Sequence, residues 1–266
     1  MAPYHAFVTA NPTTIAIANQ KGGVGKSTTA INLGAALALQ GEKVLLVDLD
    51  PQGNATSGLG VDRASIEQSI YDVLVAEVAP EDVIEPTSVR NLHVIPATID
   101  LAGAEIELVS TFSREQRLRN ALKRLDADYD FILIDCPPSL GLLTINAMTA
   151  ADEVLVPVQC EYYALEGVGQ LLKNVELVTN NLNPELIVEG VVMTMFDGRT
   201  NLASEVVDQV RTHFGETAYE TIIPRTVRLS EAPSFGEPIE AFDEMSRGAI
   251  AYRELGREFR RRHGRT

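Results

Sequence analysis

Residues 19–29 read N-Q-K-G-G-V-G-K-S-T-T, and this stretch decides the fold. It holds three glycines, two lysines and three hydroxyl side chains in eleven positions. The apolar run I-A-I-A precedes it at residues 15–18, and apolar residues recur at helical spacing over residues 30–39. The order of strand, glycine-rich loop and helix predicts a phosphate-binding loop.

The backbone of this loop is expected to bind the phosphates of a nucleotide. Glycine permits backbone angles that are closed to other residues and lets the chain approach a ligand closely. Successive N–H groups can then point at an anion, with a helix N-terminus behind them. The residues expected to bind in this way are Gly22, Gly23, Val24 and Gly25.

Three polar side chains follow the glycines. Lys26 is expected to reach the β- and γ-phosphates and to take part in catalysis as a fixed positive charge. The hydroxyl of Ser27 is expected to bind Mg²⁺. Thr28 is expected to support the α-phosphate.

The spacing of the loop departs from the common pattern G-x-x-x-x-G-K-[ST], because Gln20 stands where the first glycine would fall. The loop instead begins K-G-G at residue 21 and resembles the deviant Walker A motif of the ParA/MinD class. This resemblance implies that the additional lysine, Lys21, is a catalytic residue. It would reach across a dimer interface to the nucleotide bound by the partner protomer.

Strand-like and helix-like segments alternate along the whole chain. Near-continuous apolar strands are predicted at residues 43–48, 92–95, 131–135, 153–158 and 187–193, and helices at 100–125, 162–182, 202–214 and 249–262. This alternation predicts the α/β fold of P-loop NTPases, a mostly parallel twisted sheet with helices on both faces. We expect a flexible N-terminal extension over residues 1–13 and a single ATPase domain over residues 14–266.

Two predicted strands end in aspartates, at the edge of a parallel sheet where ligands bind. After the first of them, Asp50 is expected to orient the attacking water and to contribute to the magnesium site. Asp48 lies one strand step deeper and suits either the metal shell or support of the loop. After the second, Asp135 is expected to accept a hydrogen bond from a Mg²⁺-bound water or from Ser27, and the turn P-P-S-L-G at residues 137–141 to act as a switch.

The chain carries a formal net charge of −15, which argues against a generally basic nucleic-acid-binding protein. The charge is uneven, however. Residues 199–266 contain eleven arginines and eleven acidic residues, so the whole negative excess lies in residues 1–198. Any anion-binding face is therefore expected in the C-terminal quarter.

The two cysteines, Cys136 and Cys160, lie far apart without metal-site spacing, which predicts free thiols in a reducing compartment. An iron–sulfur cluster at a dimer interface is the alternative. No apolar run reaches the roughly 18 residues of a transmembrane helix, and no membrane partner is expected. No Lys or Arg precedes Lys21, so a signal peptide is not expected.

Four stretches resemble the chromosomal ParA/Soj partitioning ATPases, and the resemblance extends from residue 14 to residue 259. They are A-N-Q-K-G-G-V-G-K-S-T-T-A-I-N-L at 18–33, V-D-L-D-P-Q-G-N-A-T-S-G-L-G at 47–60, I-D-C-P-P-S-L-G-L-L-T-I-N-A at 134–147, and P-R-T-V-R-L-S-E-A-P-S-F-G-E-P-I at 224–239. The resemblance implies a weak Mg²⁺-dependent ATPase whose ATP-bound sandwich homodimer binds double-stranded DNA without sequence preference. A ParB-like centromere-binding protein would stimulate hydrolysis and release the dimer, partitioning chromosome or plasmid origins. The expected location is the cytoplasm, on the nucleoid.

The same resemblance assigns residues in the C-terminal quarter. Pro224 and Arg225 would lie near the adenine, and Arg199 and Arg228 on the DNA-binding face. The arginines at residues 260–262 are expected to add to DNA contact or to stay solvated. Three alternatives stay open: a MinD-like membrane-cycling protein, an ATPase that positions protein clusters on the nucleoid, and a metal-cluster reductase component.

Overall fold

The computed structural model describes residues 12–162 and 164–265, apart from the side chains of 164–166, and this part of the chain contains an eight-stranded sheet. The strand order is β3-β4-β2-β5-β1-β6-β7-β8, and every neighbouring pair is parallel except β3 with β4. The bounds are β1 Thr13–Ile17, β2 Val44–Asp48, β3 Glu85–Pro86, β4 Leu92–Ile95, β5 Phe131–Asp135, β6 Glu153–Gln159, β7 Ile187–Phe196 and β8 Ala218–Pro224. The expected mostly parallel sheet is confirmed.

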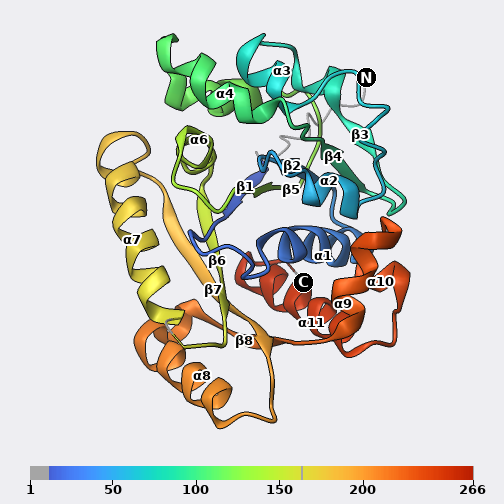
Figure 1. Ribbon diagram of the computed structural model, residues 1–266, viewed down its shortest axis with the longest axis vertical. Helices are drawn as coiled ribbons and strands as arrows, with labels where there is room; N and C mark the ends of the chain where they lie inside the picture. The colour runs from blue at the N-terminus through green and yellow to red at the C-terminus, as the bar shows by residue number, and fades with distance from the viewer. Residues whose placement is uncertain (1–11, 163, 266) are drawn as a thin grey trace, which may run out of the picture.

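Helices cover both faces of the sheet (Figure 1). On one face lie α1 Lys26–Leu39, α2 Asn54–Gly58, α9 Val227–Glu231, η5 Ala232–Phe235, α10 Ile239–Phe242 and α11 Arg247–Arg262. On the other lie α3 Ile70–Val75, η1 Pro80–Val83, α4 Leu101–Glu107, α5 Arg117–Leu122, α6 Leu142–Ala150, α7 Ala164–Asn181 and α8 Asn201–Phe214. Among the described helices, none combines the length and apolar character that crossing a bilayer requires.

The two hydrophobic cores follow from the alternation of side chains along each buried strand. In β1, Ile15 and Ile17 pack with α1 and α11, whereas Ala16 and Ala18 belong to the opposite core. All four are at most 1% exposed, as expected for a central parallel strand covered on both faces. The sheet therefore holds the residues that follow β1 in a fixed position.

The helix predicted over residues 100–125 is broken in the structure. α4 ends at Glu107, the short turns η2 Leu108–Ser110 and η3 Arg114–Gln116 follow, and α5 begins at Arg117. Ser113 adopts a left-handed conformation with φ 53°, which ends the helical path. Because the chain changes direction at Ser113, Leu108 and Leu118 pack in the same core. The apolar periodicity of residues 100–125 therefore comes from two short helices and not from one long helix.

The other boundaries differ by a few residues from those predicted. Thr200 caps α8 by accepting a hydrogen bond from the N–H of Ala203, and Ser246 caps α11 in the same way. At the N-terminus, residues 1–11 lie outside the described residues. Thr13 already pairs with Phe131 as the first residue of β1, so the expected extension over 1–13 is too long at its end.

The first and last helices pack against each other, as Figure 1 shows for α1 and α11. A Cβ atom at Gly256 of α11 would lie 2.8 Å from Nε2 of Gln40 and 3.1 Å from the Cβ of Ala36 in α1, so a larger residue would require the two helices to shift. Further along α11, Phe259 is fully buried, and its ring packs edge-on against that of Phe131, with 5.3 Å between the ring centroids. This packing fixes the helix that begins with Lys26.

Phe259→Ala should lower the free energy of unfolding by about 3–5 kcal/mol, because it leaves a cavity between α11 and the sheet. Urea unfolding followed by circular dichroism measures the loss. Arg261→Ala, on the exposed side of the same helix, is the matched control and should change stability little. Equal stability of the two variants would contradict the packing role of Phe259.

Candidate functional site

The glycine-rich loop joins β1 to α1 and needs glycine at two positions. Gly23 and Gly25 have φ values of 74° and 90°, in the left-handed region that favours glycine. Gly25 stands at the N-cap of α1, and its carbonyl accepts a hydrogen bond of 2.8 Å from the N–H of Thr29. The first turn of α1 therefore opens directly from the loop.

Neighbouring strands hold the loop in place from outside. The hydroxyl of Thr194, near the end of β7, donates a hydrogen bond of 2.8 Å to the carbonyl of Val24. Asn19 donates through its amide to the carbonyl of Pro157 at 2.7 Å and accepts from the N–H of Lys21 at 3.0 Å. Both β6 and β7 thus position the loop, although they lie far from it in the sequence.

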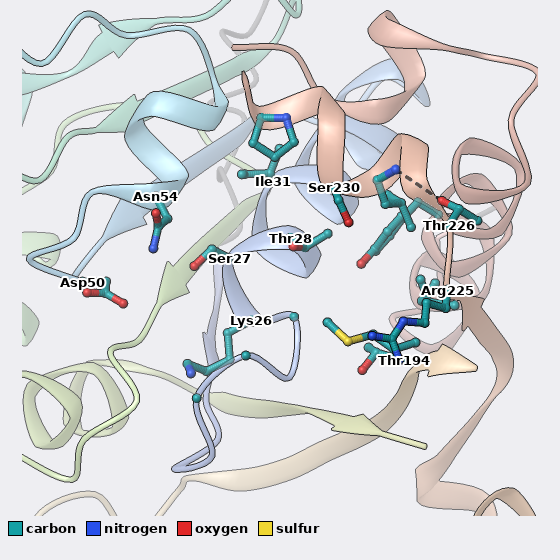
Figure 2. A pocket seen from close by; sticks show the side chains of 18 of the residues that line it. Lys26, Ser27, Thr28, Ile31, Asp50, Asn54, Thr194, Arg225, Thr226 and Ser230 are labelled. Carbon is teal, nitrogen blue, oxygen red and sulfur yellow. Dashed lines mark hydrogen bonds between the residues drawn. The ribbon is translucent and has the colours of Figure 1, made fainter. Parts of the chain in front are cut away.

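Lys26 is the first residue of α1 and is buried, with 6% of its surface exposed. Burial lowers the pKa of its ammonium group, and the nearby carboxylates of Asp135 and Asp50 oppose this effect. The side chain points into the space that it shares with Ser27 and Asp50 (Figure 2). This arrangement presents a cation where an anionic ligand can reach it.

Asp48 is fully buried at the end of β2 and supports the following loop. Its carboxylate accepts hydrogen bonds from the N–H of Thr56 at 2.8 Å, the hydroxyl of Thr56 at 2.7 Å and the N–H of Asp50 at 3.1 Å. Burial raises its pKa to about 6. Because three donors already engage this group, the geometry favours loop support over the metal shell.

Asp135 lies beside Asp48 at the end of β5 and is fully buried. Neither of its carboxylate oxygens has a hydrogen-bond partner. Burial, reinforced by Asp48, raises its pKa well above the usual range. The nearby hydroxyl of Ser27 opposes this increase in the pKa of Asp135, although the two side chains do not form a hydrogen bond. An unpartnered buried carboxylate beside a serine fits a hydrated Mg²⁺ ion.

The cavity, of about 570 Å³, extends from the glycine-rich loop to the ends of β7 and β8. Figure 2 shows Asp50 and Asn54 on one side of it and Arg225 and Ser230 on the other. The predicted residues that line it are Gly22, Gly23, Gly25, Lys26, Ser27, Thr28, Asp50, Pro224 and Arg225. Lys21, Val24, Asp48 and Asp135 are not part of the lining. The structure thus brings both predicted ends of a nucleotide site together.

Pro138, in the turn predicted to act as a switch, also lines the cavity. The lining residues that were not predicted from the sequence are Ile31, Gln52, Asn54, Ser57, Thr194, Met195, Ile223, Thr226, Leu229, Ser230, Pro233 and Tyr252. Asn54 could have been found, because it closes the P-Q-G-N segment after Asp50. Met195 has φ 53°, unusual for a residue with a side chain. The ends of β7 and β8 approach the loop only through the fold, so their sequence carries no such signal.

Comparisons with known proteins agree with this geometry. A family model described as an AAA domain matches residues 12–188. Over 244 residues the chain is 62% identical to the sporulation initiation inhibitor protein Soj of Bacillus subtilis, covering 92% of this chain and 96% of that one. Over 248 residues it is 56% identical to the chromosome partitioning protein ParA of Myxococcus xanthus, covering 93% and 88%. The chain belongs to the ParA/Soj family.

A solved structure extends the comparison. The crystal structure of cobyrinic acid a,c-diamide synthase from Mycobacterium smegmatis, with bound ADP and magnesium, matches with a TM-score of 0.83 and 42% identity. The match covers 95% of this chain and 96% of that one. The P-loop NTPase fold of this ParA/Soj protein is thereby confirmed, and a role as a partitioning ATPase follows from its family.

The two arginines expected on the DNA-binding face lie beyond the cavity. Arg199 follows the end of β7, and its side chain is 87% exposed. Arg228 lies on α9, with 56% of its side chain exposed. Each is paired with acidic residues of its own chain.

Of the arginines at residues 260–262, Arg261 is exposed, as expected of a solvated side chain, whereas Arg260 and Arg262 form ion pairs within the chain, contrary to expectation. Arg260 pairs with Glu42 at 2.8 Å, and Arg262 pairs with Glu258 at 3.1 Å. Arg265 pairs with Glu42 and with Asp130, each at 2.6 Å. These partly buried pairs fix α11 to the base of the sheet, so the tail is not a free DNA-binding arm.

Both cysteines are free and buried, as predicted. Burial raises the pKa of the Cys160 thiol to about 11 and that of the Cys136 thiol further. Among the described residues, no three His, Cys, Asp or Glu side chains are placed to hold a metal. Inward-facing thiols do not suit a cluster shared between two protomers.

Lys26→Ala should weaken ATP binding roughly 10- to 150-fold, the range for losing a hydrogen bond to a charged group. Calorimetry measures the affinity. Lys43→Ala, which removes an exposed lysine paired with Asp128, is the control and should bind as the wild type does. Wild-type affinity in Lys26→Ala would mean that phosphate binds elsewhere.

Proposed function

We propose that this ParA/Soj protein is an ATP-driven switch for DNA segregation. One observation supports this most: a glycine-rich loop and a buried lysine line a cavity large enough for a nucleotide, and the unpartnered buried carboxylate of Asp135 lies near that lysine. Its relatives in Bacillus subtilis and Myxococcus xanthus are named for sporulation control and chromosome partitioning. The proposed cofactors are ATP and Mg²⁺, in keeping with the ADP and magnesium of the solved neighbour.

The residues around the phosphate end of the cavity have separate proposed roles. The N–H groups of residues 22–25 bind the phosphates, and Lys26 places its charge at the β- and γ-phosphates. Mg²⁺, when bound, neutralises developing charge on these phosphates. Ser27 would hold it directly, with Asp135 and Asp50 holding its water ligands. Asp50 also orients the water that attacks the γ-phosphate.

The other end of the cavity would bind the base. Pro224 and Arg225 lie there, at the end of β8, and are proposed to contact the adenine. Thr226 and Ser230 add hydroxyl groups at the same end (Figure 2). With its base at the Arg225 end of the cavity, the nucleotide would extend its phosphates toward the glycine-rich loop.

Two protomers are proposed to close over two ATP molecules. Lys21 does not line the cavity of its own protomer, so its ammonium group is available to a nucleotide held by a partner. Such a cation is needed, because each protomer carries a net charge of −15 and each ATP adds more negative charge. Weak hydrolysis, stimulated by a ParB-like protein, would then separate the protomers.

The dimer is proposed to bind double-stranded DNA without sequence preference through Arg199 and Arg228. Dimerisation doubles the number of phosphate contacts, so DNA affinity depends steeply on ATP. The protein would act in the cytoplasm on the nucleoid, moving chromosome or plasmid origins. Positioning of protein clusters on the nucleoid would use the same cycle.

Two other functions fit the observations less well. The solved neighbour is named a diamide synthase, but at 42% identity it is less similar than the Soj and ParA relatives. A MinD-like membrane cycle would need a membrane-binding segment. The basic helix α11 cannot supply it, because its apolar side is buried against the sheet.

Asp50→Ala should still bind ATP and dimerise, but its turnover should fall about 10²- to 10⁴-fold, because the attacking water is no longer oriented. Phosphate release measures turnover, and gel filtration with Mg-ATP measures dimerisation. Asp62→Ala, in the exposed loop that follows, should retain wild-type turnover. Turnover unchanged in Asp50→Ala would rule out the assignment.

Arg199→Glu and Arg228→Glu test the DNA-binding face. Each should weaken DNA binding at every sequence and reduce the slope of log affinity against log salt by about 0.9 per lost phosphate contact. Fluorescence anisotropy with Mg-ATP across a salt series measures both, and light scattering checks dimerisation. Arg257→Glu, an exposed arginine of α11, is the control. If both salt slopes match the control, the DNA face lies elsewhere.

A further inference from the structure

Both arginines of the proposed DNA face are held by carboxylates of their own protomer. Arg199 donates from Nε and Nη2 to the two oxygens of Asp197, at 2.8 and 2.6 Å. Arg228 donates from Nη1 to Glu231 at 3.2 Å, and its Nε forms an ion pair with Asp243, also at 3.2 Å. These carboxylates occupy the donor groups that would otherwise bind phosphate oxygens.

These pairs differ from the other arginine pairs near the C-terminus. The side chains of Arg199 and Arg228 are 87% and 56% exposed, whereas that of Arg260 is 21% exposed. An exposed ion pair contributes little to folding, because solvent and salt screen it. Exchange of Asp197 or Asp243 for a phosphate therefore leaves the fold intact, whereas loss of the partly buried Arg260 pair with Glu42 would weaken one attachment of α11 to the sheet.

Both pairs also adjoin residues that line the cavity. Met195 lines it, and Asp197 follows two residues later in the turn that leads to Arg199. On α9, Leu229 and Ser230 line the cavity directly after Arg228. The N–H of Arg225 donates to the carbonyl of Phe196 at 2.9 Å and joins the two strand ends. The paired arginines are thus built on the segments that a nucleotide would contact.

We infer that carboxylates of the free protomer lower its affinity for DNA, because Asp197 neutralises Arg199 and Asp243, together with Glu231, neutralises Arg228, so that DNA phosphates must displace them. This inference rests on the proposed DNA-binding function and adds residues to it. Each contact with DNA then exchanges one anion for another, so its net contribution is small. A single protomer stays below the affinity needed to hold DNA, and the dimer, with two such surfaces, exceeds it.

The test removes the two carboxylates while keeping the local turn. In Asp197→Asn the side-chain oxygen can still accept the hydrogen bond of 3.1 Å from the N–H of Arg199. Asp197→Asn and Asp243→Asn should each raise DNA affinity about two- to fivefold, the range for an exposed ion pair. The double variant should gain about four- to twentyfold if the sites are additive. Fluorescence anisotropy at one fixed salt concentration, with and without Mg-ATP, measures the gain.

Glu205→Gln is the matched control, since it also removes one negative charge. Glu205 is exposed on α8 and has no ion pair within the part of the chain that the structure describes. Its DNA affinity should stay at the wild-type value. ATP binding and dimerisation should be unchanged in all three single variants, because none of these residues lines the cavity.

A double variant that binds DNA no more tightly than Glu205→Gln overturns the inference. Arg199→Glu and Arg228→Glu in the same assay show which idea has failed. If they lose DNA binding while the Asn variants gain none, the DNA face stands and the counter-charge role is wrong. If they bind DNA normally, the DNA face itself is wrong, and the inference fails with it.

Discussion

Charges buried together at the ends of β1, β2 and β5 are the constraint on which the rest of the structure depends. Asp135 has no hydrogen-bond partner and no exposed surface, and Lys26 is nearly as buried. Burying a charge without a partner is costly, so the fold must hold both groups ready for a ligand that compensates them. Thr56 meets part of this cost by engaging Asp48 with two hydrogen bonds. Binding of a magnesium nucleotide would stabilise the fold by an amount that rises with the logarithm of its concentration relative to Kd.

The local parts of the site could be predicted from the sequence, because its spacing and flanks carry the signal. Gly25 and Lys26 lie between an apolar strand and a helix rich in apolar residues, and Asp50 and Asp135 lie at the ends of apolar runs. The sequence placed Asp48 one strand step deeper than Asp50 but did not indicate its hydrogen bonds to Thr56, which favour loop support.

Features that depend on distant contacts could not be predicted in the same way. Thr194 in β7 bonds to Val24, which follows β1 two strands away in the sheet, and nothing in the sequence near either residue indicates this bond. The break at Ser113 arises because two short helices share one core, which a single periodic pattern conceals. The arginines at residues 260–262 were expected to form a solvated tail, because Glu42, the partner of Arg260, is more than two hundred residues away in the sequence.

The position of β1 in the centre of the sheet has a consequence for synthesis on the ribosome. Thr13 pairs with Phe131, and Ile15 with Glu153, so β1 cannot pair with its neighbouring strands until more than half of the chain has been synthesised. Tyr252, whose hydroxyl lies 3.2 Å from that of Thr29, is the last of the cavity-lining residues to be synthesised. A nascent chain therefore carries an apolar strand and an unfinished phosphate loop until translation is nearly complete. In this topology, the nucleotide site is complete only when nearly the whole chain has been synthesised.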